Sequence, residues 1–298
     1  MLHRRALLAL AAASSLAGAL PAQAQDFPHK PIKFVVPFPP GSGTDTSARY
    51  FGKKLSELTG QPVVVENKAG ANGFLAVQAV LAAPADGYTV FVGSNSTLAV
   101  NVALFKALPY DPVADFAPLT MMMRSPALLV VPGNSPHKTL PELIAAAKAK
   151  PTALNYGAGS AGYQLMAELF NDAAKVQLTH VPFKGANEAV AAVAAGTVEM
   201  AFAEMTSAQE MVKSGRIRAL AVASDKRTVA LPEVTTAAEA EKLAALLTQI
   251  ERLPETRAFY ERIGAEVMQG GPQEMRAFQA EEIRLWKRIA TQAKVELQ

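Results

Sequence analysis

Short apolar runs alternate with amphipathic stretches along the first third of the chain, and this alternation predicts strands and helices in turn. A β-branched run at residues 31–36 stops at a proline- and glycine-rich turn, and apolar residues at helical spacing follow over 44–58. A strand at 63–66, a helix at 74–83 and a strand at 88–92 continue the pattern. This order predicts a parallel sheet with helices on both of its faces.

The pattern restarts further along the chain. Two apolar runs, 119–123 and 127–131, are separated by Arg124, Ser125 and Pro126, and we place the first crossing between two domains there. Helices and strands then alternate to residue 223, including a glycine-rich turn at 157–162 that leads into a helix. Beyond 235 helices prevail, and we expect the last one, 273–293, to pack its apolar face on the first domain.

These elements predict an α/β protein made of two Rossmann-like domains that face each other across a cleft. We assign residues 25–124 and 226–298 to domain 1 and residues 125–225 to domain 2.

The first 24 residues have the pattern of an export signal. His3, Arg4 and Arg5 precede an apolar stretch over 6–19, and an A-x-A site ends at Ala24. The sequence therefore predicts a periplasmic protein that is cleaved after Ala24.

Composition narrows the classes of function. Half of the residues are apolar, which is enough for a substantial core, and the absence of cysteine excludes disulfides and thiol chemistry. The formal net charge of +3, which falls further when the signal is removed, gives no reason to expect nucleic acid. No cofactor motif or metal-ligand spacing is evident, so we expect neither cofactor nor metal and no enzyme. A serine hydrolase that uses Ser42 with His180 is the alternative, although Ser42 lies outside a G-x-S-x-G elbow.

The turn at residues 41–45 is the first candidate binding site. It joins a strand to a helix, and free N–H groups of a first helical turn can hold an anion such as a carboxylate. The alternative is an ordinary turn in which Thr44 or Asp45 is the N-cap. Asp45 would repel a carboxylate unless the ligand also carries an ammonium group.

Other candidates follow the ends of other strands. Ser94, Asn95 and Thr97 are either hydroxyl and amide donors at the cleft or a cluster of N-caps. Lys184 and Glu204 contact either the ligand or water. The complete set of expected ligand-binding residues is Phe38, Gly41, Ser42, Gly43, Thr44, Asp45, Ser94, Asn95, Thr97, Gly159, Ser160, Gly162, Lys184, Gly185 and Glu204.

Several motifs, in order along the chain, resemble one family. They are Pro-Phe-Pro-Pro-Gly-Ser-Gly-Thr-Asp-Thr-Ser-Ala-Arg at 37–49, Val-Glu-Asn-Lys at 65–68, Gly-Ala-Asn-Gly at 70–73, Ala-Asp-Gly-Tyr-Thr at 85–89, Leu-Pro-Tyr-Asp-Pro at 108–112, His-Val-Pro-Phe-Lys-Gly at 180–185 and Arg-Ala-Leu-Ala-Val at 218–222. Together they resemble the receptors of tripartite tricarboxylate transporters, the Bug family of periplasmic solute-binding proteins. The resemblance covers roughly residues 26–298.

The resemblance implies a Venus-flytrap fold like that of type II periplasmic binding proteins. It also implies a small carboxylate ligand: a di- or tricarboxylate, an acidic amino acid or an aromatic acid. The expected partners are the membrane permease subunits of a tripartite transporter or, in a signalling role, a sensor kinase of a two-component system. We expect a monomer.

The chain departs from the family's usual pattern at several points. Ser42 replaces the second of two glycines, which would strain the backbone by about 1 kcal/mol if that position needs a positive φ. Gln164 replaces a histidine, and Ala203-Glu204 replaces Asp-Asn at a strand end. After Ala240 the chain lacks a segment that relatives carry, including a strand expected to return to domain 1. We interpret this as an internal deletion that weakens the hinge.

Overall fold

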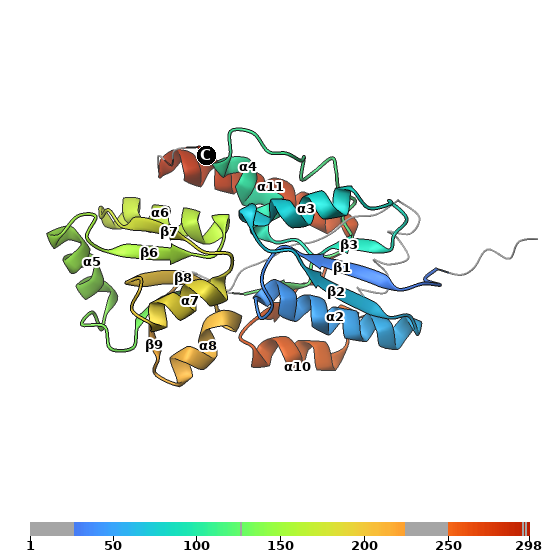
Figure 1. Cartoon of the computed structure of the whole chain (residues 1–298), viewed down its shortest axis with the longest axis horizontal. Coiled ribbons are helices and arrows are strands. Elements are labelled where there is room, and N and C mark those ends of the chain that lie inside the picture. Colours follow the sequence, from blue (N-terminus) through green and yellow to red (C-terminus); the bar gives the residue numbers. More distant parts are fainter. Residues whose placement is uncertain (1–26, 126, 224–249, 294, 296) are drawn as a thin grey trace, which may run out of the picture.

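The structure, a computed structural model, describes residues 27–125, 127–223, 250–293, 295 and 297–298. Two α/β units lie side by side, and the C-terminal helix α11 (Pro272–Gln292) runs along both of them (Figure 1). This is the mixed α/β architecture predicted from the sequence. We keep the terms domain 1 and domain 2 for the two predicted units. The expected export signal and the inferred deletion after Ala240 lie outside the described residues.

Domain 1 contains the predicted parallel sheet. Its central strand is β1 (Ile32–Val36), with β2 (Val63–Asn67) on one side and β3 (Thr89–Phe91) on the other, all parallel. Helix α2 (Gly43–Thr59) follows β1, and α3 (Phe74–Leu81) follows β2. Because the strands are parallel, their carboxyl ends and the N-terminus of α2 meet at one edge, which faces domain 2 (Figure 1).

The start of α2 differs from the expectation in one respect. Ser42, and neither Thr44 nor Asp45, is the N-cap, and its hydroxyl accepts a hydrogen bond from Asp45 N at 3.2 Å. Ser42 has an extended backbone with φ −66°, whereas Gly41 takes the positive φ of +84°. The strain expected at Ser42 is therefore absent, because the preceding glycine makes the left-handed turn.

Helix α2 covers one face of this sheet. Its apolar residues Ala48, Phe51 and Leu55 are fully buried against Ile32 and Phe34 of β1. Helix α10 (Pro254–Arg262) lies beside α2 and closes the same cluster with Tyr260 (Figure 1). This packing fixes the N-terminus of α2 with respect to the sheet.

Domain 2 is built on a five-stranded sheet of order β7-β6-β8-β5-β9, in which β5 runs antiparallel to both of its neighbours. The strands are β5 (Ala127–Pro132), β6 (Asn155–Ala158), β7 (Thr179–Pro182), β8 (Met200–Glu204) and β9 (Ile217–Ala223). The helices are α5 (Leu140–Ala149), α6 (Ala161–Ala174), α7 (Ala186–Ala194) and α8 (Met205–Lys213). The carboxyl ends of β6 and β8 point toward domain 1 (Figure 1).

Two short strands surround the predicted crossing between the domains. Strand β4 (Met123–Arg124) pairs antiparallel with β10 (Glu266–Val267), and β5 of the second sheet begins at Ala127. Arg124 is therefore the last residue of β4, and Ser125 follows it shortly before β5 begins. The predicted return to domain 1, near residue 225, lies outside the described residues.

Helix α11 packs on domain 1, where the sequence analysis expects it, and it also contacts domain 2. Met275 is buried in a cluster of domain 1, together with Val35 and Phe91. Further along, Ala290 packs with Leu165 of α6 in domain 2. Helix α11 also contacts a π-helical turn (Ser96–Val100) and α4 (Asn101–Leu104), which follow β3 in the chain. In the part of the chain that is described, no helix has the length and apolar character needed to cross a bilayer.

One buried carboxyl group in domain 1 makes stability depend on pH. Glu251 is 2% exposed and lies against the hydroxyl of Thr120, which also bonds the Gly270 carbonyl at 2.7 Å. Burial raises the pKa of Glu251 to about 7, despite hydrogen bonds that lower it. A raised pKa means that the folded state binds this proton more tightly than the unfolded state does.

We therefore expect the contribution of Glu251 to wild-type stability to be largest below about pH 4. This contribution should be lost as the pH rises through 7. Glu251→Gln removes the titration, so the free energy of unfolding of the variant should fall about 2 kcal/mol less than that of the wild type between pH 5 and pH 8. Urea denaturation at the two pH values measures this. Glu261→Gln, on the exposed side of α10, is the control; equal pH dependence of Glu251→Gln and the wild type would contradict the assignment.

Candidate functional site

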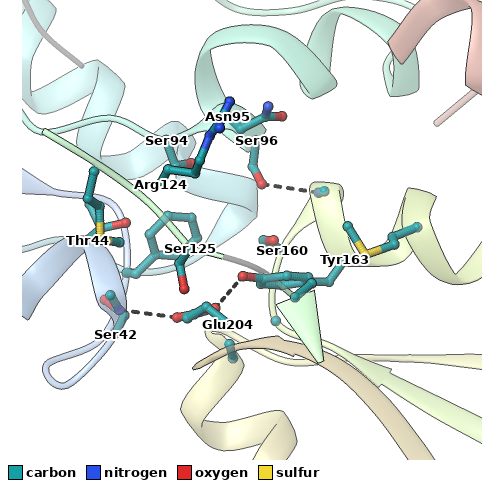
Figure 2. A pocket seen from close by; sticks show the side chains of 18 of the residues that line it. Ser42, Thr44, Ser94, Asn95, Ser96, Arg124, Ser125, Ser160, Tyr163 and Glu204 are labelled. Carbon is teal, nitrogen blue, oxygen red and sulfur yellow. Dashed lines mark hydrogen bonds between the residues drawn. The ribbon is translucent and has the colours of Figure 1, made fainter. Parts of the chain in front are cut away.

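A cavity of about 350 Å³ lies between the two domains, where the N-termini of α2 and α6 approach each other (Figure 2). Its size suits a small organic ligand. Most of its wall is apolar, and a few polar groups project from different elements. It is lined by Phe38, Ser42, Gly43, Thr44, Ser94, Asn95, Ser96, Met123, Arg124, Ser125, Ala127, Gly159, Ser160, Gly162, Tyr163, Met166, Ala186, Glu204, Phe278, Glu282, Leu285 and Trp286.

Glu204 forms one side of the cavity, at the carboxyl end of β8. Its Oε1 accepts from Gly43 N at 3.1 Å and from Ser207 Oγ at 2.8 Å, and its Oε2 accepts from the Tyr163 hydroxyl (Figure 2). Glu204 of domain 2 thus places its carboxylate against the N-terminus of α2 in domain 1. The positive end of the helix dipole and three donors suit that carboxylate.

Tyr163 is held as a hydrogen-bond donor. Burial raises the pKa of its phenol well above the ordinary value, and the charge of Glu204 raises it further. The phenol therefore stays protonated and donates to Glu204. Tyr163 is the third residue of α6, so the position of this donor follows from where that helix begins.

Arg124 lies on the opposite side of the cavity, with Ser94, Asn95 and Ser96 (Figure 2). Its guanidinium is 3.7 Å from Glu266 across the β4–β10 pair, and about a quarter of the side chain is exposed. Arg124 is the basic side chain among the described lining residues. A guanidinium beside three polar side chains is a suitable site for a carboxylate.

The C-terminal helix contributes a second acidic group. Glu282 Oε2 accepts from Trp286 Nε1 at 2.9 Å and also accepts from the amide of Asn95. The indole of Trp286 and the side chains of Phe278 and Leu285 form an apolar wall beside it. Helix α11 therefore supplies both apolar surface and a carboxylate to the cavity.

The N-terminus of α6 is engaged across the cleft as well. Gly162 N donates to Ser96 Oγ of domain 1 at 3.1 Å, and Asn187 of α7 donates to Pro40 O at 3.1 Å. The glycine turn before α6 also packs tightly on its neighbour, since a Cβ on Gly159 would overlap backbone atoms of Gly185 and Ala186. The two hydrogen bonds therefore join the domains across the cleft, and the close packing of Gly159 joins two turns within domain 2.

Ten of the fifteen residues expected from the sequence line this cavity, and five do not: Gly41, Asp45, Thr97, Lys184 and Gly185. Lys184 lines a neighbouring cavity of about 400 Å³, together with Asn72 and Glu188. Gly185 lies against Pro39.

Asp45 and Thr97 have structural partners. Asp45 accepts from Gly41 N at 2.9 Å, Asn67 Nδ2 at 2.8 Å and Arg49 Nε at 3.0 Å. Burial alone would raise the pKa of Asp45, but these hydrogen bonds outweigh it and lower the pKa below its ordinary value. Thr97 Oγ1 accepts from Ser94 N at 3.0 Å, and the Thr97 side chain is fully buried.

Sequence reasoning missed several lining residues. Arg124 and Ser125 lie at the end of β4 and before β5, where the sequence signal is only a break between two apolar runs. The sequence predicts a helix at Tyr163 but no role for its side chain. The cavity residues of α11, Phe278, Glu282, Leu285 and Trp286, lie more than a hundred residues from the turns that they face. Helical periodicity predicts an apolar face that includes Phe278 and Trp286, but it does not predict what that face covers.

The structure does not bring Ser42 and His180 together as the alternative hydrolase requires. Ser42 Oγ is engaged as the cap of α2, and His180 stacks on Tyr156 of β6 with ring centroids 5.1 Å apart. His180 is not among the described residues that line the cavity with Ser42. No cluster of three metal-ligating side chains occurs within the described ranges.

A sequence model described as "Tripartite tricarboxylate transporter family receptor" matches residues 47–243. The chain belongs to this family. It is 37% identical over 243 residues to the UPF0065 protein in the tcbD-tcbE intergenic region of Pseudomonas sp. strain P51, covering 81% of this chain and 72% of that protein. It is also 37% identical over 224 residues to protein BugT of Bordetella pertussis, covering 74% of this chain and 69% of BugT.

Solved structures agree with the family. R. palustris Rpa4515 with adipate is 30% identical, with a TM-score of 0.86, and the match covers 92% of this chain and all of that one. MatC from Rhodopseudomonas palustris with bound malate is 28% identical, with a TM-score of 0.81 and coverage of 88% and 99%. The chain is therefore a member of a family of periplasmic solute-binding proteins, as the sequence motifs indicated.

Proposed function

We propose that this protein captures a small carboxylate in the cavity between its domains and delivers it to the membrane permease subunits of a tripartite tricarboxylate-type transporter. One observation carries the proposal. A cavity of ligand size is lined from both domains, and it has an arginine with several hydroxyl and amide groups along one side. A ligand that touches both domains stabilises the closed arrangement over an open one, which is the way a receptor of this kind signals that it is loaded.

The similar proteins support the ligand class. Their printed descriptions name adipate in one case and malate in another, and both are small carboxylates. The carboxylate would bind at Arg124, with Ser94 and Ser96 as hydroxyl donors. The apolar wall of α11 would cover the body of the ligand. A periplasmic place of action and removal of residues 1–24 are parts of the same proposal.

Ligand-induced stabilisation tests this function. Protein lacking residues 1–24 is heated in the presence of malate, adipate, citrate, glutamate, leucine, phenylalanine or benzoate. A true ligand at 100 times its Kd adds about 2.7 kcal/mol of stability, which raises the melting temperature by about 5 °C or more. No shift with any carboxylate, confirmed by calorimetry, would refute carboxylate capture. Ester turnover abolished by Ser42→Ala would instead favour the hydrolase.

A further inference from the structure

The charges around the cavity do not match a ligand with two carboxylates. Two acidic side chains, Glu204 and Glu282, line it, whereas Arg124 is the single basic side chain among its described lining residues. Arg124 is itself 3.7 Å from a third acid, Glu266. A dicarboxylate would bring two negative charges into a space that already has more carboxylates than cations, and like charges in a partly buried site repel strongly.

The acidic groups are also placed where a carboxylate ligand would otherwise bind. Glu204 is 8% exposed, and it accepts from Gly43 N, the donor at the start of α2 that a ligand anion would use. This helix terminus is the one that the sequence predicts to hold the ligand. Instead the protein's own carboxylate occupies it, so this side of the cavity offers acceptors and negative charge to a ligand.

The opposite side keeps the chemistry of a carboxylate site. Figure 2 shows Arg124 near Ser94 and Asn95, away from the side where Glu204 accepts from Tyr163 and Gly43 N. Between the two sides, Ser125 Oγ is buried and has no hydrogen-bond partner among the described residues. A polar group of a bound ligand is expected to supply the hydrogen-bond partner that this hydroxyl lacks.

We propose that the ligand of this protein is an amino acid-like zwitterion with an apolar body. Its carboxylate binds at Arg124, and its ammonium group faces Glu204 on the other side of the cavity. Glu282, which accepts from Asn95 beside Arg124, adds negative charge that disfavours a second ligand carboxylate. The apolar body packs against Trp286, Phe278 and Met166. This inference rests on the proposed capture of a carboxylate and specifies its ligand. Glu204 and Glu282 are then the residues that select zwitterions over dicarboxylates.

Matched ligands distinguish selection of a zwitterion from capture of any small carboxylate. Calorimetry at pH 7.5 compares leucine and phenylalanine with the same molecules lacking the amino group (4-methylpentanoate and 3-phenylpropanoate), with the amines lacking the carboxylate (isopentylamine and phenethylamine), and with adipate and malate. We expect leucine or phenylalanine to bind at least about tenfold more tightly than its deaminated partner and than either dicarboxylate. The amines should bind weakly, because the Arg124 side then lacks its carboxylate.

Variants test which residues make the selection. Glu204→Gln keeps the shape of the side chain and should weaken amino acid binding by about tenfold or more, while the deaminated acids and adipate bind equally well or more tightly. Glu282→Gln, on a different element, should shift the preference in the same direction and serves if Glu204→Gln fails to fold. Glu210→Gln on α8 and Glu281→Gln on α11 remove an exposed charge and should leave all affinities unchanged.

The outcomes test the zwitterion inference separately from the proposed capture of a carboxylate. Adipate, malate or a deaminated acid binding as tightly as the amino acids would overturn the zwitterion inference and leave carboxylate capture standing. A uniform loss of affinity for every ligand in both variants would also overturn it, because that result indicates a structural role for the acids. If no molecule with a carboxylate binds the wild type, both the inference and the proposed function fall.

Discussion

Replacing Arg124 by methionine should weaken binding of the carboxylate ligand by at least about 100-fold, because a charged partner of a carboxylate in a partly enclosed site contributes several kcal/mol. Methionine keeps much of the apolar stem, so the cavity keeps its shape. Isothermal calorimetry with a ligand identified by thermal shift measures the change. Arg284→Met, on the exposed face of α11, is the matched control and should bind normally.

The effect of this variant on stability can be measured separately from its effect on ligand affinity. The guanidinium is 3.7 Å from Glu266, and both side chains are partly exposed, so loss of the ion pair costs little stability. The melting temperature of the unliganded variant should therefore stay close to that of the wild type. A Kd within threefold of the wild-type value would remove Arg124 from the site, and the carboxylate would have to be placed elsewhere in the cavity.

The turn at the start of α2 shows how far local sequence can predict a site. The strand, the turn and the helix were all predictable, since apolar periodicity switches there and three prolines and two glycines interrupt it. The capping residue was not, because Ser42, Thr44 and Asp45 all have side chains that can cap a helix. The choice depends on which residue makes the left-handed turn, and that residue is Gly41.

Asp45 illustrates a signal that was present but not used. Asp45 and Arg49 are four residues apart on α2, a spacing at which side chains of opposite charge meet on a helix. With Asn67 at the end of the neighbouring strand as a further partner, Asp45 is satisfied within domain 1. The structure therefore gives it a role in shaping the turn, and the acidic character of the cavity comes from Glu204 and Glu282 instead.

The rest of the cavity could not be read from the sequence for a physical reason. A helix face that is apolar must be buried, but periodicity does not say whether it covers its own domain, the other domain or a ligand. Helix α11 covers all three, with Met275 in domain 1, Ala290 against α6 and Trp286 beside the cavity. Only the tertiary arrangement distinguishes these positions along one helix.

Substituting Gly159 by alanine should destabilise the whole protein by about 3 kcal/mol or more. The added methyl group would overlap backbone atoms of Gly185 and Ala186, which no side-chain rearrangement can relieve, and overpacking of this kind is at the upper end of measured costs. The melting temperature should fall by about 6–12 °C. Differential scanning calorimetry of the unliganded protein measures it.

Gly60→Ala is the informative comparison for this variant. Gly60 ends α2 with φ +70° and has no atom within 4 Å of the position of an added Cβ, so alanine there meets only backbone strain of about 1 kcal/mol. A Gly159→Ala variant as stable as Gly60→Ala would mean that the turn before α6 packs more loosely on Gly185 than the structure shows. If the larger loss is found, the close approach of these two turns is a structural requirement of the cleft. An aspartate at position 159 would then abolish binding by unfolding the turn, so the ligand site has to be mapped at Arg124 and Glu204, where side chains can be changed without moving the backbone.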